Sequence, residues 1–183
     1  MVCDNCPLRL FNDKGYNISG IGNSSYGNMA ILPNIDEEAY KNNDISFSKQ
    51  LDVINQILSK GEFQKNFYIT SLIKCKETSN CITTDIIIRN CQIHLMNEIK
   101  RCNPRHVILF GSSIRRLFNV NISIEQVIGK IYVSPNNRIY YFNYSPFIVY
   151  KNIDKQSVFI EELLKAYYSI TNKYYYEYEK LIL

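Results

Sequence analysis

Four of the six cysteines in this 183-residue chain are spaced as metal ligands would be. Cys3 and Cys6 form a C-x2-C pair close to the N-terminus, Cys75 ends an apolar run, and Cys91 lies 16 positions further on. A C-x2-C turn points two thiolates at one metal centre, and two thiolates from separate elements complete a four-ligand set. We therefore expect a metal centre that fixes the N-terminal segment to the body of the fold.

The spacing by itself leaves the metal open. Four thiolates suit a zinc ion or a [4Fe–4S] cluster. The competing interpretation is that these are reduced core cysteines. It is the better interpretation of Cys91 taken alone, but a pair at an extreme N-terminus has little core in which to be buried. The two remaining cysteines, Cys81 and Cys102, are expected to be ordinary thiols.

The bulk composition is that of a globular protein. Hydrophobic residues make up 46% of the chain and charged residues 21%, which distinguishes it from disordered sequences. The length suits one domain over residues 1–183, with 1–27 as a metal-binding N-terminal segment and 172–183 as a tyrosine-rich C-terminal tail. The net charge of +4 is compatible with a nucleic-acid partner but indicates one only weakly.

The N-terminus and the apolar runs indicate where the protein works. No apolar run approaches the roughly 18 residues that span a bilayer, so no membrane partner is expected. The N-terminus lacks the basic and apolar regions of a signal peptide. An intracellular protein with reduced thiols is therefore expected, and cysteines in such a protein favour metal binding over disulfide bonds.

Short apolar runs alternate with amphipathic stretches, as in a layered α/β domain. Strands are expected over residues 28–33, 67–74, 106–110, 130–133 and 138–143, with helices over 48–60, 85–101 and from about residue 155. Repeated strand–helix–strand units give parallel strands with helices on both faces. The expected fold is a three-layer α/β/α sandwich with a mostly parallel central sheet.

Several of these segments together resemble one known family. Pro7 and Leu8 follow the cysteine pair, where the family has C-x2-C-x-L. Residues 68–75 (Tyr-Ile-Thr-Ser-Leu-Ile-Lys-Cys) resemble its Y-I-T-N-V-V-K-C, and residues 104–111 (Pro-Arg-His-Val-Ile-Leu-Phe-Gly) resemble its P-x-x-I-V-x-L-G. The chain thus resembles the iron–sulfur (family-4) uracil-DNA glycosylases over roughly residues 3 to 150. The resemblance implies a structural [4Fe–4S] cluster on Cys3, Cys6, Cys75 and Cys91, with zinc as the less favoured occupant.

The same resemblance implies that the catalytic groups are lost. A glycosylase takes its target base out of the stack and needs groups that activate water, read the base and stabilise the leaving group. The family's water-activating Glu corresponds to Ile31, its base-reading Asn to Ser71, and its His to Asn143. Ile31 cannot accept a proton, and a serine lacks the paired donor and acceptor of an amide. We expect uracil excision to be absent or strongly impaired.

Two features leave room for an altered site. Asp36, Glu37 and Glu38 follow the first strand and offer a relocated carboxylate, although solvated acids or a helix start is the plainer interpretation. Phe47 matches the family's stacking aromatic residue, with an ordinary core residue as an equal alternative. A base pocket would then combine Phe47 with Ser71 and Asn143.

DNA binding can survive the loss of chemistry, because phosphate contacts need only cations and polar groups. The predicted DNA contacts are Lys49 beside the aromatic residue, and Ser145 and Lys151 after the last strand. Further candidate cations for this DNA surface are Arg115, Arg116, Lys130 and Arg138. Scattered solubilising charges are the alternative interpretation of all these cations.

The leading hypothesis is a DNA-binding, catalytically inactive or impaired relative that acts in a nucleic-acid-processing complex, such as one for DNA repair. One alternative is an active DNA glycosylase with a rearranged site, and another is a protein-interaction module without DNA binding. Residues 172–183 offer tyrosines for a protein partner. The plainer alternative for this tail is a last helix that packs on its own sheet.

Overall fold

The computed structural model describes residues 3, 6–10, 17–59, 61–77, 84–171 and 176–182. Cys81, the side chain of Arg115, and parts of the N-terminal segment and of the C-terminal tail lie outside the described residues.

The described strands form one seven-stranded sheet in the order β1-β3-β2-β4-β6-β5-β7. They are β1 (Ile21–Gly22), β2 (Asn28–Leu32), β3 (Tyr68–Ser71), β4 (His106–Phe110), β5 (Lys130–Val133), β6 (Ile139–Asn143) and β7 (Glu179–Leu181). The pairs β3–β2, β2–β4, β4–β6 and β5–β7 are parallel, whereas β1–β3 and β5–β6 are antiparallel. The expected α/β fold with a mostly parallel sheet is confirmed.

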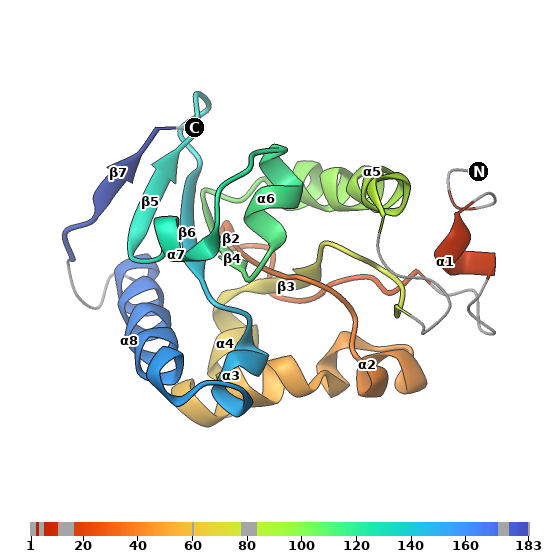
Figure 1. The fold of residues 1–183 in the computed structure, drawn as a ribbon, viewed down its shortest axis with the longest axis horizontal. Coiled ribbons are helices and arrows are strands. Elements are labelled where there is room, and N and C mark those ends of the chain that lie inside the picture. Colours follow the sequence, from red (N-terminus) through yellow and green to blue (C-terminus); the bar gives the residue numbers. More distant parts are fainter. Residues whose placement is uncertain are drawn as a thin grey trace.

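Helices cover both faces of this sheet (Figure 1). The helices are α1 (Pro7–Leu10), α2 (Glu37–Asn42), α3 (Lys49–Leu58), α4 (Glu62–Asn66), α5 (Asp85–Cys102), α6 (Ser113–Phe118), α7 (Ile124–Val127) and α8 (Ile153–Ile170), with 3-10 turns η1 (Ile45–Phe47) and η2 (Pro146–Tyr150). In Figure 1, α5 and α6 lie on one side of the sheet and α2, α3, α4 and α8 lie on the other.

Alternate residues of the central strand β2 face opposite helical layers. Ala30 and Leu32 belong to the apolar cluster that includes residues of α3, α4 and α8, whereas Met29 and Ile31 belong to the cluster around α5. All four side chains are fully buried. Because successive side chains of a strand point to opposite faces, one apolar strand supplies both cores.

The second expected strand is shorter than its apolar sequence. β3 ends at Ser71, although Leu72 and Ile73 are also buried. The amide of Leu72 still donates to the carbonyl oxygen of Leu32 (2.8 Å), after which the chain leaves the sheet. This departure places Cys75 in the cluster around α5.

The C-terminal tail does not continue the last helix. Beyond α8, β7 pairs in parallel with β5 and so lies at one edge of the sheet, as the blue strand in Figure 1 shows. The ring of Tyr178, just before β7, packs edge-on against Tyr141 of β6 with centroids 5.4 Å apart. The tail residues described here therefore complete the sheet.

Candidate functional site

Three of the four predicted metal-ligating cysteines are buried in the apolar cluster around α5. Cys6, Cys75 and Cys91 are 2%, 7% and 3% exposed, and Cys3 is partly exposed. The N-terminal pair forms a turn in which the amide of Cys6 donates to the carbonyl oxygen of Cys3 (3.1 Å). Three separate segments thus supply the thiols: this turn, the loop after β3, and α5.

The thiols influence one another electrostatically. Burial, followed by repulsion from the other cysteines, raises the pKa of Cys75 to about 12. Burial also raises the pKa of Cys91 to about 11, although a hydrogen bond from the backbone of Lys74 opposes the change. A metal binds the thiolate form and displaces the proton, so a bound cation would offset both effects. The chemistry of the donor set therefore fits a thiophilic metal group.

The described side chains do not surround a single metal ion. No group of three or more His, Cys, Asp or Glu residues in the described part of the chain is arranged to hold one. In a tetrahedral zinc site every sulfur lies about 2.3 Å from the same ion, so the sulfurs are in near contact with one another. The metal centre therefore stays a prediction that rests on the chemistry and the spacing of the four cysteines.

His94 is a polar neighbour of this site that the sequence analysis missed. Its Nε2 lies 3.0 Å from the Sγ of Cys3. Burial, and then the charge of Lys74, lowers the pKa of His94. The available signal was its position three residues after Cys91 on α5, since residues three apart share a helix face.

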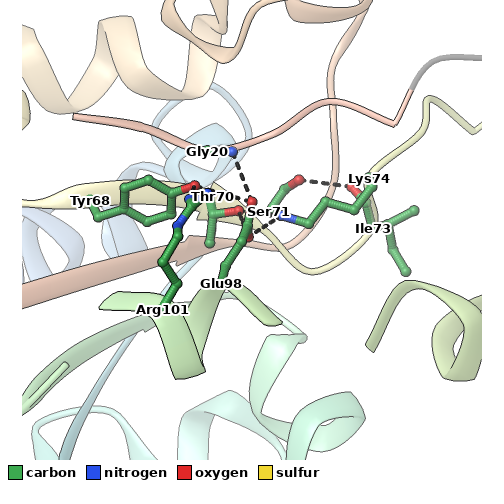
Figure 2. A network of polar contacts seen from close by, with 8 residues as sticks. All are labelled: Gly20, Tyr68, Thr70, Ser71, Ile73, Lys74, Glu98 and Arg101. Atoms are coloured by element: carbon green, nitrogen blue, oxygen red, sulfur yellow. Dashed lines mark hydrogen bonds and ion pairs between the residues drawn. The ribbon is translucent and has the colours of Figure 1, made fainter. Parts of the chain in front are cut away.

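A buried ion pair joins Lys74, the residue before Cys75, to Glu98 of α5 (Figure 2). The ammonium of Lys74 is 2.5 Å from the carboxylate of Glu98, and the two side chains are 1% and 10% exposed. Glu98 also accepts hydrogen bonds from the hydroxyls of Thr70 (2.6 Å) and Tyr68 (3.2 Å) and from the amide of Gly20 (3.0 Å). These donors stabilise the ionised carboxylate, because buried charges need pairing and hydrogen bonds.

The titration behaviour of Glu98 reflects these contacts. Burial tends to raise its pKa, but Lys74 and the hydrogen-bond donors outweigh burial and hold the pKa below 4.5. Burial lowers the pKa of Lys74, and the attraction of Glu98 opposes that change. The donors around the carboxylate of Glu98 favour the ionised form of the pair. The pair joins the segment that carries Cys75 to α5.

The three positions that match catalytic groups in the resembled family are closed within the protein. Ile31 is fully buried in the cluster around α5. The hydroxyl of Ser71 donates to the carbonyl oxygen of Ile73 (2.9 Å), as Figure 2 shows. The side-chain amide of Asn143 donates to the carbonyl oxygen of Phe159 on α8 (3.0 Å). Groups that would read a base are therefore bonded inside the fold.

A family model described as the uracil DNA glycosylase superfamily matches residues 31–166, from β2 into α8. The chain belongs to this superfamily. The matched segment contains Cys75 and Cys91 but starts after the N-terminal cysteine pair, and it does not specify an iron–sulfur subfamily. A comparison with curated proteins finds no similar sequence. Within the described residues, no helix is long and apolar enough to cross a membrane.

The acids that follow β2 in this superfamily member have structural contacts. Asp36 caps α2, and one of its oxygens accepts a hydrogen bond from the hydroxyl of Ser48 (2.5 Å). Glu37 forms an ion pair with Lys76, and Glu38 pairs with a neighbouring lysine on the same helix. These contacts agree with the plainer interpretation of the acids as a helix start.

The structure places Phe47 on the surface, where its side chain is 53% exposed. Lys49 begins α3 close by and is exposed. Turn η2 packs against α3 and ends at Tyr150, which is 66% exposed and precedes the exposed Lys151. We call these four exposed residues, which lie in or next to the contacting elements α3 and η2, the aromatic–basic surface. Tyr150 was missed by the sequence analysis, although an aromatic residue beside a lysine is a usable signal for nucleic-acid binding.

Ser145, the remaining predicted DNA contact, lies at the carboxyl end of the sheet. Ser145 is partly buried and lies close to Gly111: a Cβ atom placed on Gly111 would be 3.1 Å from the Cβ of Ser145. Gly111, Ser145 and Lys155 line a cavity of about 250 Å³. Ser71 and Asn143 are thus buried and Ser145 is partly buried, whereas all four residues of the aromatic–basic surface are exposed.

Proposed function

We propose that this member of the uracil-DNA glycosylase superfamily is an iron–sulfur protein that binds DNA without excising uracil, as part of a nucleic-acid-processing complex. The observation that carries the proposal is the closed state of the base-reading positions. Ser71 and Asn143 direct their hydrogen bonds to backbone carbonyls inside the fold, and Ile31 is fully buried where the related enzymes have a carboxylate.

Loss of these groups removes the chemical step. Excision requires stabilisation of the charge that develops on the leaving base, and each preorganised group contributes roughly 10²- to 10³-fold in rate. No described carboxylate replaces the missing one directly after β2, because Asp36 caps a helix and both Glu37 and Glu38 pair with lysines. The retained capability is binding.

The aromatic–basic surface supports DNA binding. Exposed Phe47 and Tyr150 offer ring faces on which bases stack, with about 1–3 kcal/mol per stacked base. Lys49 and Lys151 stand next to these rings in the sequence and supply cations for phosphates. Aromatic rings interleaved with cations are suited to unpaired strands, whose bases are accessible.

The resemblance of the cysteine-bearing segments to the iron–sulfur uracil-DNA glycosylases supports a cluster rather than zinc. Cys6, Cys75 and Cys91 are buried, and the other cysteines raise the pKa of Cys75 and Cys91. A bound cation would offset both of these pKa changes. Cys3, Cys6, Cys75 and Cys91 would hold the cluster, which would tie the N-terminal turn to α5 as a structural element.

The decisive experiment measures binding and excision on the same uracil-containing single-stranded oligonucleotide. We expect binding at low salt and no abasic sites. The double variant Phe47→Ala/Tyr150→Ala should weaken binding about tenfold or more, whereas Tyr26→Ala, at another exposed aromatic (63%), should not. Abasic sites would establish an active glycosylase with a rearranged site. Absence of DNA binding would favour the alternative of a protein-interaction module.

A separate experiment tests the cluster. Protein purified without oxygen should contain iron and acid-labile sulfide. Cys6→Ser and Cys91→Ser should each lose most of the iron, while Cys102→Ser, a buried cysteine on the same helix as Cys91, should keep it. Zinc without iron in the native protein would contradict the assignment.

A further inference from the structure

A cavity of about 660 Å³ lies between α5 and the segment that follows β4. Its walls are Asp85, Ile88, Arg89 and Gln92 from α5, and Ser112, Arg116, Asn119, Val120 and Asn121 from the other side. Figure 1 shows α5 and α6 on the same face of the sheet. The volume is within the range of small-molecule sites. We call it the arginine cavity; none of the predicted metal ligands or base-pocket residues lines it.

The position of the cavity is where open α/β sheets bind ligands. β3 lies on one side of β2 and β4 on the other, so the strand order reverses between β2 and β4. Ligands bind outside the carboxyl ends of the strands at such a reversal. Ser112 follows the carboxyl end of β4 and brings this edge into the cavity wall.

The charged groups of the cavity are available to a ligand. Among the described residues, neither Arg89 nor Arg116 forms a salt bridge with a carboxylate, although Asp85 lines the same cavity. The side-chain amide of Gln92 donates to the carbonyl oxygen of Arg116 (2.8 Å). This hydrogen bond ties the two walls together, so one arginine stands on each wall of a preorganised space.

We propose that the arginine cavity binds the phosphomonoester of a nucleotide. Two guanidinium groups suit a phosphate because their N–H groups form bidentate, charge-assisted hydrogen bonds. The carboxylate of Asp85 can accept hydrogen bonds from a sugar hydroxyl or a base amine of the same nucleotide. The side-chain amide of Asn119 adds a donor and an acceptor for the rest of the nucleotide.

Two sources offer this chemistry: the 5′-terminal nucleotide of a DNA strand, and a free mononucleotide. The strand-end source rests on the proposed function, whereas the free nucleotide does not. In both cases the phosphate lies between Arg89 and Arg116, so the same variants test both.

The experiment compares three ligands on the intact protein: a short single-stranded oligonucleotide with a 5′-phosphate, the same strand with a 5′-hydroxyl, and thymidine 5′-monophosphate with thymidine as its control. We expect at least about tenfold tighter binding of the 5′-phosphorylated strand, since a hydrogen bond to a charged group contributes that much. The free nucleotide is the ligand instead if the protein binds the monophosphate but not thymidine, and binds the two strands with equal affinity.

Variants locate the effect. Arg89→Gln and Arg116→Gln should each remove the phosphate preference, whereas Lys100→Gln, which removes one charge from the exposed end of α5, should keep it. Ser112→Asp adds a negative charge to the wall without removing an arginine and should also abolish the preference. A thermal melt confirms that each variant is folded.

The outcomes separate this inference from the proposed function. Equal affinity for both strands together with no binding of the monophosphate overturns the arginine cavity while leaving DNA binding intact. A preference that survives Arg116→Gln and Ser112→Asp also overturns it. Failure to bind any oligonucleotide overturns the proposed function. In that case, binding of the monophosphate supports the arginine cavity and its absence overturns it.

Discussion

At the scale of single residues, buried polar groups decide most of what this protein can do. Lys74 is almost fully buried, and its charge is accommodated only because Glu98 lies 2.5 Å away. Ser71 and Asn143 are equally buried, and their hydrogen bonds go to backbone carbonyls. The ion pair of Lys74 and Glu98 stabilises the fold next to Cys75. The side chains of Ser71 and Asn143 are unavailable to a base because they are already bonded inside the protein.

Glu98→Gln should destabilise the protein by about 3–5 kcal/mol, because it leaves the buried Lys74 without a counter-charge. Urea denaturation at pH 7 measures the change in the free energy of unfolding. The double variant Lys74→Met/Glu98→Leu is the control and should be less destabilised than Glu98→Gln alone, since it removes both charges. An equal loss of unfolding free energy in both variants would contradict the role of Glu98 as the counter-charge of Lys74.

The same pair predicts how stability depends on pH. The pKa of Glu98 is lower in the folded protein than its ordinary value of 4.5. A depressed carboxyl pKa stabilises the fold above pH 4.5, and this contribution is lost as the pH falls through the lower, folded pKa. The difference in unfolding free energy between wild type and Glu98→Gln should therefore narrow below pH 4.5. A constant difference from pH 7 to pH 3 would show that Glu98 is not the titrating group.

Ile31→Glu should not restore uracil excision. The position is 0% exposed and faces the apolar cluster around α5, so a new carboxylate there is buried without a partner. A loss of at least about 3 kcal/mol is expected. Abasic-site formation and urea denaturation test both points, with Ile31→Val as a control that loses only about 1 kcal/mol. A stable and active Ile31→Glu variant would mean that the base pocket is intact.

At the scale of elements, the last strand protects an edge of the sheet. β7 pairs with β5, which otherwise has β6 as its only described neighbour. An unpaired strand edge is a template for association with other chains. The ring of Tyr178 anchors the tail, since it packs on Tyr141 and the ammonium of Lys165 lies 4.6 Å from its centroid. A protein partner at this tail remains a proposal.

Tyr178→Ala should destabilise the fold by about 2 kcal/mol, because it removes a partly buried ring from two contacts. Tyr178→Phe should retain most of this stability, since the ring stays in place. Thermal unfolding followed by circular dichroism measures both changes. Tyr176→Ala, at the more exposed neighbouring tyrosine, should have a smaller effect. An unaffected Tyr178→Ala protein would mean that the tail does not contribute to the fold in solution.

At the scale of the whole molecule, a net charge of +4 is too small to specify DNA binding, so the placement of the cations matters. Lys49 and Lys151 stand beside exposed aromatic rings, whereas Lys130 and Lys155 form ion pairs with Glu179 and Glu125. The first two lysines therefore account for most of the expected phosphate contacts on the aromatic–basic surface.

Lys49→Gln/Lys151→Gln should reduce the salt dependence of DNA binding. Each phosphate contact contributes about 0.7 to the slope of log K against log salt for a single strand, so the slope should fall by about 1.4. The slope is obtained from dissociation constants measured at salt concentrations from about 50 to about 200 mM. Lys180→Gln, an exposed cation on β7, is the control. An unchanged slope would place the phosphate contacts elsewhere.

The sequence by itself determined the fold class and the main strands. Residues 106–110 and 130–133 form β4 and β5 with the expected bounds, because β-branched and aromatic residues favour strands. The motifs in turn resembled a uracil-DNA glycosylase, and the match over residues 31–166 confirms the superfamily. These signals depend only on neighbouring residues, which is why the sequence alone contains them.

Only the tertiary structure decided which polar groups are available. Lys74 and Glu98 are 24 positions apart in the chain, and Asn143 and Phe159 are 16 apart, so no local pattern pairs them. The sequence was equally consistent with Phe47 as a base-stacking residue and as a core residue, and the structure places it on the surface. A hydrogen bond between distant segments exists only once the fold brings them together. The availability of each site residue is therefore a property of the folded chain rather than of its motifs.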